Sequence, residues 1–295
     1  MLDDTELGIA LFVDGFAHSP ARMKKLFLAL DEGFHRLGIV PNRLGAGRVG
    51  ISGKGKYKTY RGLRPRLLKS DFSDIEYFTL EYLPMGRSDE SLKSWAAQAF
   101  VCYDQEIIEL TDAIVWKVFM MVFPGDVGVS EHRVIEEMLT IARSAADEYG
   151  CITRMRRGAY PPFFDSDVGF GGEDRFRTMD ESNNRYTWTR FGVWTRRLLR
   201  DTFPINFLDR SRLDLPIEGT TLEKWIRARP DERGTVEPFN RRVWMWRPVI
   251  ERIPFIREPL FRAGILHWYG FFMIDDYTQR QVPAPPPGEW FRIPK

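Results

Sequence analysis

The stretch Leu7–Leu37, LGIALFVDGFAHSPARMKKLFLALDEGFHRL, decides the fold that the sequence predicts. Its first residues form a short apolar run that ends at Asp14-Gly15, which is the pattern of a buried strand. Ser19-Pro20 then provides an N-cap and a first helical residue, and Gly38 provides a stop. Between them, apolar residues recur at spacings of three and four and define one helix face: Met23, Leu26, Phe27, Leu30, Phe34 and Leu37.

The same order of signals returns in the middle of the chain. Residues 112–123 form a strand-like apolar segment, and Pro124-Gly125 ends it. Ser130 caps a predicted helix that runs through Tyr149 and stops at Gly150. Its buried face is predicted to carry Val134, Met138, Ile141 and Ala145. The two strand–loop–helix units share a pattern but not residue identities, so the sequence leaves open whether they arose by duplication.

The segments around and between these units predict strands. Residues 48–52, 76–82 and 95–103 alternate or carry β-branched and aromatic side chains, and no long helix separates them. A further strand is predicted at 151–157. Consecutive strands favour antiparallel neighbours over parallel crossovers. The sequence therefore predicts an α+β fold, with a mainly antiparallel sheet and the two long helices packed on one face.

Two glycine-rich segments precede basic residues, and each is compatible with a phosphate-binding loop or with a turn between two strands. Gly45–Gly47 and Gly50–Gly55 contain the residue type that cradles phosphate in some loops. A turn between two strands needs the same glycines, and we expect the turn.

The remaining chain divides by composition. Residues 1–157 form the predicted α+β domain, 158–187 a loop or insertion rich in turn residues, and 188–280 a smaller C-terminal α+β region. Residues 281–295 form a proline-rich, polyproline-like tail. Within the C-terminal region we expect a helix capped by Thr220 or Thr221 and a strand at Val243–Arg247. A second helix is expected at 254–264, with Pro259 near its first turn.

Composition excludes several classes of protein. The 295 residues are 43% hydrophobic and 28% charged, which excludes a disordered or fibrous chain. The net charge of +2 gives no general argument for nucleic acid or membrane binding. Two cysteines exclude a disulfide framework and a thiolate metal cluster. The acidic N-terminus does not resemble a signal peptide, and no uncharged apolar stretch approaches about 18 residues, so we expect a cytoplasmic protein without a membrane partner.

The sequence contains no strong catalytic signature. P-loop, nucleophile-elbow, HExxH and CxxC motifs do not occur. His18, His35, His132 and His267 lack metal-ligand spacing. The loop Asp165–Asp174 offers carboxylates to a hard cation but does not match the EF-hand pattern, so a solvated loop is favoured. We therefore expect no metal, no cofactor and no enzymatic activity; an enzyme with an unrecognised carboxylate or His site is an alternative.

One local charge feature points to a partner. From Lys54 to Lys69 the chain carries seven basic residues and no acid. Interleaved tyrosines and basic residues are typical of nucleic-acid surfaces, and they also suit docking onto an acidic protein face. A solvated loop is the third interpretation. The candidate binding residues, for a protein or for nucleic acid, are Lys54, Lys56, Tyr57, Lys58, Tyr60, Arg61 and Arg64.

A family resemblance begins at Pro204. The stretches that carry it are PINFL at 204–208, GTTLEKWI at 219–226, RGTVEP at 233–238, VWMW at 243–246, IPFIR at 253–257 and AGIL at 263–266. They resemble the C-terminal part of bacterial immunity proteins encoded beside polymorphic or type VI secretion toxins, the immunity protein 52 family and its relatives. ISGKGKYK at 51–58 and EYFTLEYLP at 76–84 are compatible with it.

The resemblance implies an α+β inhibitor without catalysis that binds and neutralises a cognate toxin, such as a nuclease. It transfers no site residues. The alternative is a nucleic-acid-binding or phage-defence accessory protein that uses Lys54–Lys69. The sequence identifies neither the toxin nor the oligomeric state.

Overall fold

The computed structural model divides the chain into two compact units, Met1–Phe176 and Arg177–Lys295. The division falls inside the segment 158–187, which lies outside the described residues, so the domain boundaries at 157 and 188 stay predictions. The structure describes residues 7–14, 19–47, 58–82, 97–104, 116–124, 128–156, 198–199, 202–266, 273–274 and 281–282.

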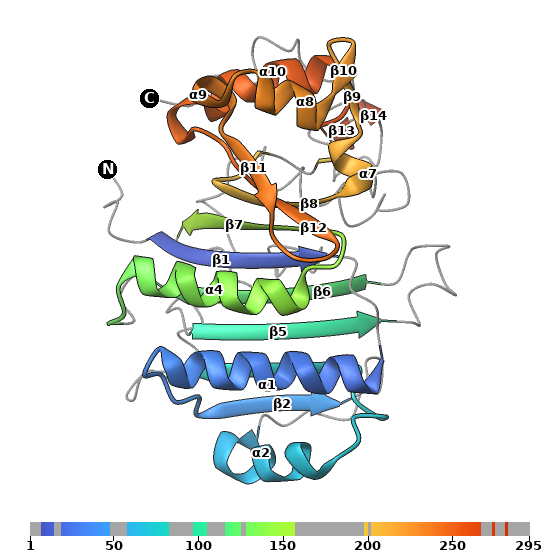
Figure 1. Cartoon of the computed structure of the whole chain (residues 1–295). Coiled ribbons are helices and arrows are strands. Elements are labelled where there is room, and N and C mark those ends of the chain that lie inside the picture. Colours follow the sequence, from blue (N-terminus) through green and yellow to red (C-terminus); the bar gives the residue numbers. More distant parts are fainter. Residues whose placement is uncertain are drawn as a thin grey trace. The chain divides into compact units, whose positions relative to one another are not determined.

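The first unit is built on an antiparallel sheet (Figure 1). In its described part the strand order is β7-β1-β6-β5-β4-β2-β3, and every neighbouring pair is antiparallel. The strands are β1 (Leu7–Asp14), β2 (Arg43–Gly47), β3 (Lys58–Thr59), β4 (Tyr77–Tyr82), β5 (Ala97–Asp104), β6 (Trp116–Pro124) and β7 (Tyr149–Arg156).

Two long helices cover one face of this sheet, α1 (Pro20–Arg36) and α4 (Glu131–Ala145) (Figure 1). Phe27 of α1 packs edge-on against Phe78 of β4 at 5.4 Å between ring centroids, and Phe34 packs against Phe123 of β6 at 5.3 Å. Every apolar residue predicted for the two inner helix faces is buried. The predicted α+β fold, with both helices on one face of an antiparallel sheet, is therefore confirmed.

Both helices begin directly after their predicted N-cap residues, Ser19 and Ser130, but only α1 also ends where the sequence predicts. Ser19 Oγ accepts a hydrogen bond of 3.1 Å from the Arg22 N–H, and Gly38 adopts a φ of 76°, as the predicted cap and stop require. The predicted extent of α4 is wrong, because the helix ends at Ala145 and Tyr149 begins β7. Pairing with β1 reaches back to Tyr149, which lies opposite Asp14.

The turn predicted at Gly45–Gly47 is also wrong, because these residues form part of β2. The ring of Tyr77, on the neighbouring strand, lies against Gly47. A Cβ added to Gly47 would be 3.5 Å from Tyr77 Cε1, which is van der Waals contact. The neighbouring aromatic ring thus supplies the packing that glycine lacks. The predicted strand at 48–52 and the segment Gly50–Gly55 are not among the described residues.

A short helix, α2 (Tyr60–Lys69), follows β3 and lies beside β2 at the edge of the sheet (Figure 1). After it, Phe72 has a positive φ of 63° although it is not glycine. Its side chain is 1% exposed and packs against Phe27 at 5.8 Å between centroids. Burial of the ring stabilises the unusual backbone conformation.

The second unit is a smaller α+β region, as predicted. Its three-stranded antiparallel arrangement β11-β12-β8 is formed by β8 (Ile205–Asp209), β11 (Thr235–Pro238) and β12 (Val243–Arg247). Trp246 of β12 is fully buried and donates its indole N–H to the Arg233 carbonyl at 2.8 Å. The helices are α7 (Arg210–Leu213), α8 (Leu222–Ala228), α9 (Pro230–Arg233), the 3-10 turn η4 (Ile250–Arg252) and α10 (Ile253–Arg262).

Two short pairs of antiparallel strands also lie in this unit. β9 (Pro216–Ile217) and β10 (Thr220–Thr221) are joined by Glu218 and Gly219, both at positive φ, as a tight two-residue hairpin turn requires. Thr221 Oγ1 then accepts from the Lys224 N–H, which confirms one of the two predicted caps for α8. β13 (Met273–Ile274) pairs with β14 (Gln281–Val282). The predicted tail therefore begins in a strand at its first two residues.

The expected position of Pro259 in the last helix is wrong. Pro254 occupies the first turn of α10, whereas Pro259 lies inside the helix. Proline has no N–H to donate to the carbonyl four residues earlier, here that of Phe255. Phe255 is 67% exposed, so water can reach this region of the helix.

Candidate binding surface on helix α2

Part of the basic stretch Lys54–Lys69 forms a helix. Tyr60, Arg61 and Arg64 lie in α2, and Lys58 lies in β3. A solvated loop is therefore excluded for residues 60–69. Lys54, Lys56 and Tyr57, also predicted as binding residues, lie outside the described residues.

The inner side of α2 is attached to α1 through Asp31. This aspartate is 1% exposed, and the Tyr60 hydroxyl donates a short hydrogen bond to its Oδ1. Arg64 donates to Oδ2 from Nε at 2.9 Å and from Nη2 at 2.7 Å. The charge of Arg64 thus compensates a buried carboxylate that would otherwise be costly.

The network fixes the protonation states of Tyr60 and Arg64. Burial, and then the hydrogen bond to Asp31, raise the pKa of Tyr60 well above its ordinary value. The hydrogen bond to Asp31 raises the pKa of Arg64. Tyr60 therefore stays neutral and Arg64 charged at any ordinary pH.

His35 extends the network to the surface. Its Nε2 lies 2.9 Å from the Tyr60 hydroxyl. Because Tyr60 gives its only proton to Asp31, the contact requires a hydrogen on His35 Nε2. Sequence spacing does not reveal this partner of His35, because the contact joins residues 25 positions apart. Asp31 was missed for the same reason, although an acid on an otherwise apolar helix face was a visible signal.

A second attachment holds the C-terminal end of α2. Lys24 of α1 donates to the Ser70 carbonyl at 3.1 Å, and its ammonium group lies 6.0 Å from the centre of the Phe72 ring. A cation at this position is favourable next to the negative end of the helix dipole. Both ends of α2 are thus fixed to α1.

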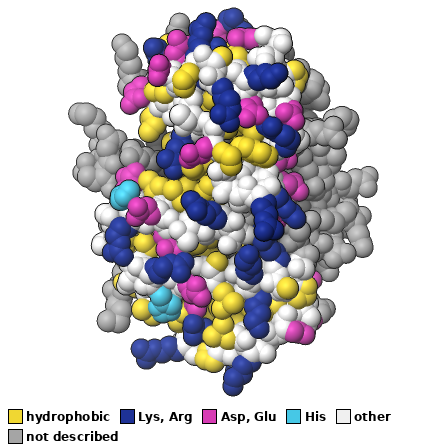
Figure 2. Space-filling view, in the orientation of Figure 1, with side chains coloured by type: hydrophobic (Ala, Val, Ile, Leu, Met, Phe, Trp, Pro, Cys, Tyr) yellow, Lys and Arg dark blue, Asp and Glu magenta, His cyan; other side chains and the backbone are white. Residues whose placement is uncertain are grey.

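The outer side of α2 carries positive charge without compensation from its own helix. Arg61, Arg66 and Lys69 are exposed, and no side-chain hydrogen bond or ion pair connects them to another described residue. The helix contains no acid. Figure 2 shows Lys and Arg side chains at the lower end of the first unit, where Figure 1 places α2. We call Arg61, Arg66 and Lys69 the α2 basic face.

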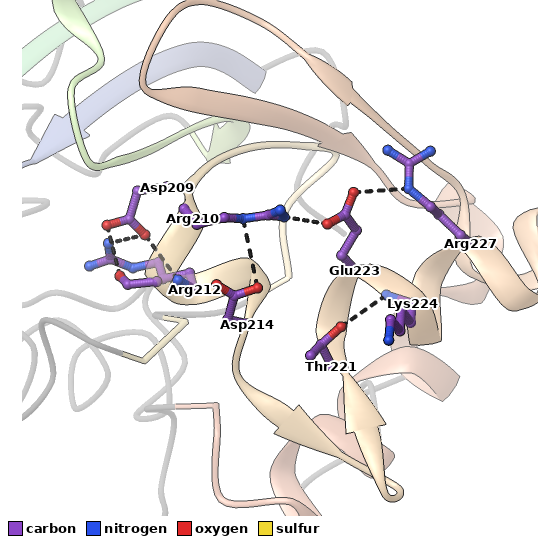
Figure 3. Close-up of polar contacts among 9 residues, drawn as sticks. Asp209, Arg210, Arg212, Asp214, Thr221, Glu223, Lys224 and Arg227 are labelled. Atoms are coloured by element: carbon purple, nitrogen blue, oxygen red, sulfur yellow. Dashed lines mark hydrogen bonds and ion pairs between the residues drawn. The ribbon is translucent and has the colours of Figure 1, made fainter.

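The second unit holds a different polar cluster, which has a structural role (Figure 3). Glu223 of α8 accepts from Arg210 of α7 and from Arg227 Nε at 3.0 Å. The Arg210 guanidinium also lies 4.7 Å from the centre of the Trp244 ring. Asp209 caps α7 by accepting from the Arg212 N–H at 3.0 Å. These charges pair with one another and hold α7 against α8.

An arginine and a tryptophan form a second structural contact in the same unit. Arg233 stacks over Trp225 with 3.7 Å between its Cζ and the ring centre. The Trp225 indole donates to Glu218 Oε2 at 2.8 Å. Burial lowers the pKa of Arg233. This contact ties the β9–β10 turn to α8 and α9.

Two large apolar side chains are exposed near α10, Ile250 at 63% and Phe255 at 67%. Arg252 lies 5.6 Å from the centre of the Phe255 ring. Phe255 therefore adds little to the core.

The described residues contain no group of three side chains arranged to hold a metal ion. His132 is exposed and lies 3.1 Å from Glu136, its neighbour one helical turn away. Cys151 is buried. His18, His267 and the Asp165–Asp174 loop lie outside the described residues, so the predicted absence of a metal, a cofactor and catalysis stays a prediction.

No protein-family model matches the chain, and neither does a curated protein. Among solved structures, the chain is similar to Pseudomonas aeruginosa type VI secretion system protein PA0821, with a TM-score of 0.52 and 13% identity. The match covers 97% of this chain and 80% of that one. At this identity the likeness shows the fold alone, and the resemblance to the immunity protein 52 family stays a prediction. In the described part of the chain, no helix has the length and apolar character needed to cross a membrane.

Proposed function

We propose that this chain is a non-catalytic immunity protein that binds a cognate bacterial toxin in the cytoplasm and neutralises it. The observation that carries the proposal is the α2 basic face, which a buried anchor holds in place and which leaves three cations without partners among the described residues. Exposed, fixed charge is suited to steering a partner protein into a defined complex.

Two further observations support a role in a toxin system. The fold is similar to that of a type VI secretion system protein over 97% of the chain. The sequence of residues 204–266 resembles immunity proteins encoded beside polymorphic or type VI secretion toxins. Neither observation identifies the toxin, so the test begins from the gene next to the one that encodes this chain.

The experiment is co-expression of that neighbouring toxin gene with the full chain. The proposal predicts that bacterial growth is rescued and that the two purified proteins elute together in gel filtration. Failure to rescue growth, together with separate elution at micromolar concentrations, would contradict it. A variant of the toxin without its catalytic residues serves as the control, because binding must survive loss of toxin activity if the chain neutralises by complex formation.

Nucleic-acid binding is the second candidate, and the same basic face favours it. It predicts direct binding of DNA or RNA by the purified chain without a toxin. The affinity would fall steeply as salt rises, because each neutralised phosphate releases counterions.

A further inference from the structure

We propose that the α2 basic face docks onto an acidic surface of the protein partner, so that Arg61, Arg66 and Lys69 contact carboxylates while Arg64 serves the fold. This inference rests on the proposed function and specifies its partner. It changes the set of contact residues that the sequence predicted, since Arg66 and Lys69 join it and Tyr60 and Arg64 leave it.

Helix geometry places the three cations on one side. Successive residues turn by about 100°, so Arg61, Pro65 and Lys69 follow one line along the helix and Gly62 and Arg66 lie beside it. All five of these residues are exposed. The line from Arg61 to Lys69 is about 12 Å long at 1.5 Å per residue. The short side chains of Gly62 and Pro65 lie between the cations and leave a partner room to approach.

The opposite side of the helix packs against the rest of the unit. Tyr60 and Leu67 are buried, and Arg64 forms a two-pronged pair with Asp31. The face therefore belongs to an anchored helix that does not have to be ordered by the partner. Pre-formed surfaces lose less conformational entropy on binding, which favours affinity.

The charge of the face identifies the partner's chemistry. α2 has no acid, and the next acid in the chain, Asp71, already accepts from the Ser73 N–H and hydroxyl at 2.9 and 2.8 Å. Arg61 and Arg66 present planar guanidinium groups, which bind carboxylates through paired hydrogen bonds. An acidic protein surface complements this arrangement.

Burial of Tyr60 argues against single-stranded nucleic acid as the occupant. Binding of unpaired bases relies on exposed aromatic rings on which the bases stack. Tyr60, the only aromatic residue of α2, is 5% exposed, and its hydroxyl is bonded to Asp31. Within α2, Arg61, Arg66 and Lys69 therefore lie on the outer side, whereas the Tyr60 ring lies on the inner side with Arg64.

The test uses the purified full chain and fluorescently labelled poly-L-glutamate as an acidic probe, with a DNA duplex and a single-stranded oligonucleotide as comparison probes. The variant R61E/R66E/K69E reverses the face. The control R229E/R241E/R247E reverses three exposed arginines of the second unit and changes the net charge equally. We expect the face variant to lose about tenfold or more in poly-L-glutamate affinity at low salt, and the control to stay close to the wild type. Thermal unfolding verifies that both variants fold.

Two results would overturn the inference. Equal losses in the face and control variants would show that the probe senses only net charge. Tighter binding of either nucleic acid than of poly-L-glutamate, abolished in the face variant, would assign the face to nucleic acid. The growth assay separates this inference from the proposed function: if the wild type rescues growth and R61E/R66E/K69E binds the toxin at an unchanged association rate, the inference fails and the immunity function stands. If the wild type does not rescue growth, the function fails.

Discussion

Arg36 and Glu137 connect the two long helices through a double hydrogen bond. Arg36 Nε donates to Oε2 at 2.9 Å and Nη2 donates to Oε1 at 2.6 Å. The Glu137 side chain is only 9% exposed, whereas that of Arg36 is 47% exposed. At the other end of the same pair of helices, Arg22 binds the Ala145 carbonyl and Asp147. The layer of helices is thus fastened at both ends by arginines of α1.

Replacement of Glu137 by Gln tests how much the Arg36–Glu137 pair contributes to stability. The substitution preserves shape but removes the charge, so the buried end of the pair loses its strongest hydrogen bonds. We expect the free energy of unfolding in urea to fall by about 1–3 kcal/mol. Glu32→Gln is the matched control, because Glu32 also contacts Arg36 but is 64% exposed, and its loss should cost less than about 0.5 kcal/mol. Equal effects would show that burial does not govern this interaction.

Gly33 permits the close approach of α1 and α4. A Cβ at this position would lie 2.7 Å from Ile141 Cδ1 and 3.0 Å from Glu137 Oε1. Alanine would otherwise favour the helix by about 1 kcal/mol, so a net loss of stability in Gly33→Ala would reveal the clash. Ile141→Val removes the contacted Cδ1 atom. It should therefore cost about 0.5–1.5 kcal/mol alone, and less when combined with Gly33→Ala. Additive effects in this double-mutant cycle would contradict the predicted contact.

The Tyr60–Asp31 bond predicts how stability depends on alkaline pH. The pKa of Tyr60 is higher in the folded chain than the ordinary value of about 10. The folded state therefore holds the proton more tightly, and the corresponding stability is complete below pH 10 and is lost as pH rises toward the folded pKa. Tyr60→Phe should flatten the fall of unfolding free energy above pH 10. Urea unfolding at a series of pH values measures this, and an unchanged slope in Tyr60→Phe would refute the assignment.

Helix α10 offers a comparison of a buried and an exposed apolar residue. Leu260 is fully buried and Phe255 is 67% exposed. Leu260→Ala should cost about 2–5 kcal/mol through the cavity it leaves. Phe255→Ala should cost less than about 1 kcal/mol, mainly its contact with Arg252. Thermal unfolding checks both, and a large loss for Phe255→Ala would mean that the ring is covered in solution.

The sequence was sufficient for the fold because the signals that define it are local. The spacing of Met23, Leu26 and Phe27 specifies a buried helix face, and Ser19 and Gly38 specify its ends. Errors arose where contacts between distant residues decide the outcome. β2 is a strand in spite of its glycines because Tyr77 covers one of them, and a single sequence does not reveal that partner.

The same distinction applies to the candidate surface. The charge of residues 54–69 was visible in the sequence, but the division of α2 into an inner and an outer side was not. It depends on Asp31, which is 29 positions from Tyr60 and 33 from Arg64. A helical projection of residues 60–69 would have placed Arg61, Pro65 and Lys69 together. It would not have shown that Arg64 is used internally.

The anchoring of α2 has a consequence for how such a surface can evolve. The side chains that hold the helix are those of Asp31, Tyr60, Arg64 and Lys24, whereas those of Arg61, Arg66 and Lys69 have no hydrogen bond or ion pair to another described residue. Substitutions on the outer side therefore change the free energy of unfolding little. Changes in the charge of this face can accumulate there one residue at a time. A change in the charge of this face therefore does not first require a compensating mutation in α1.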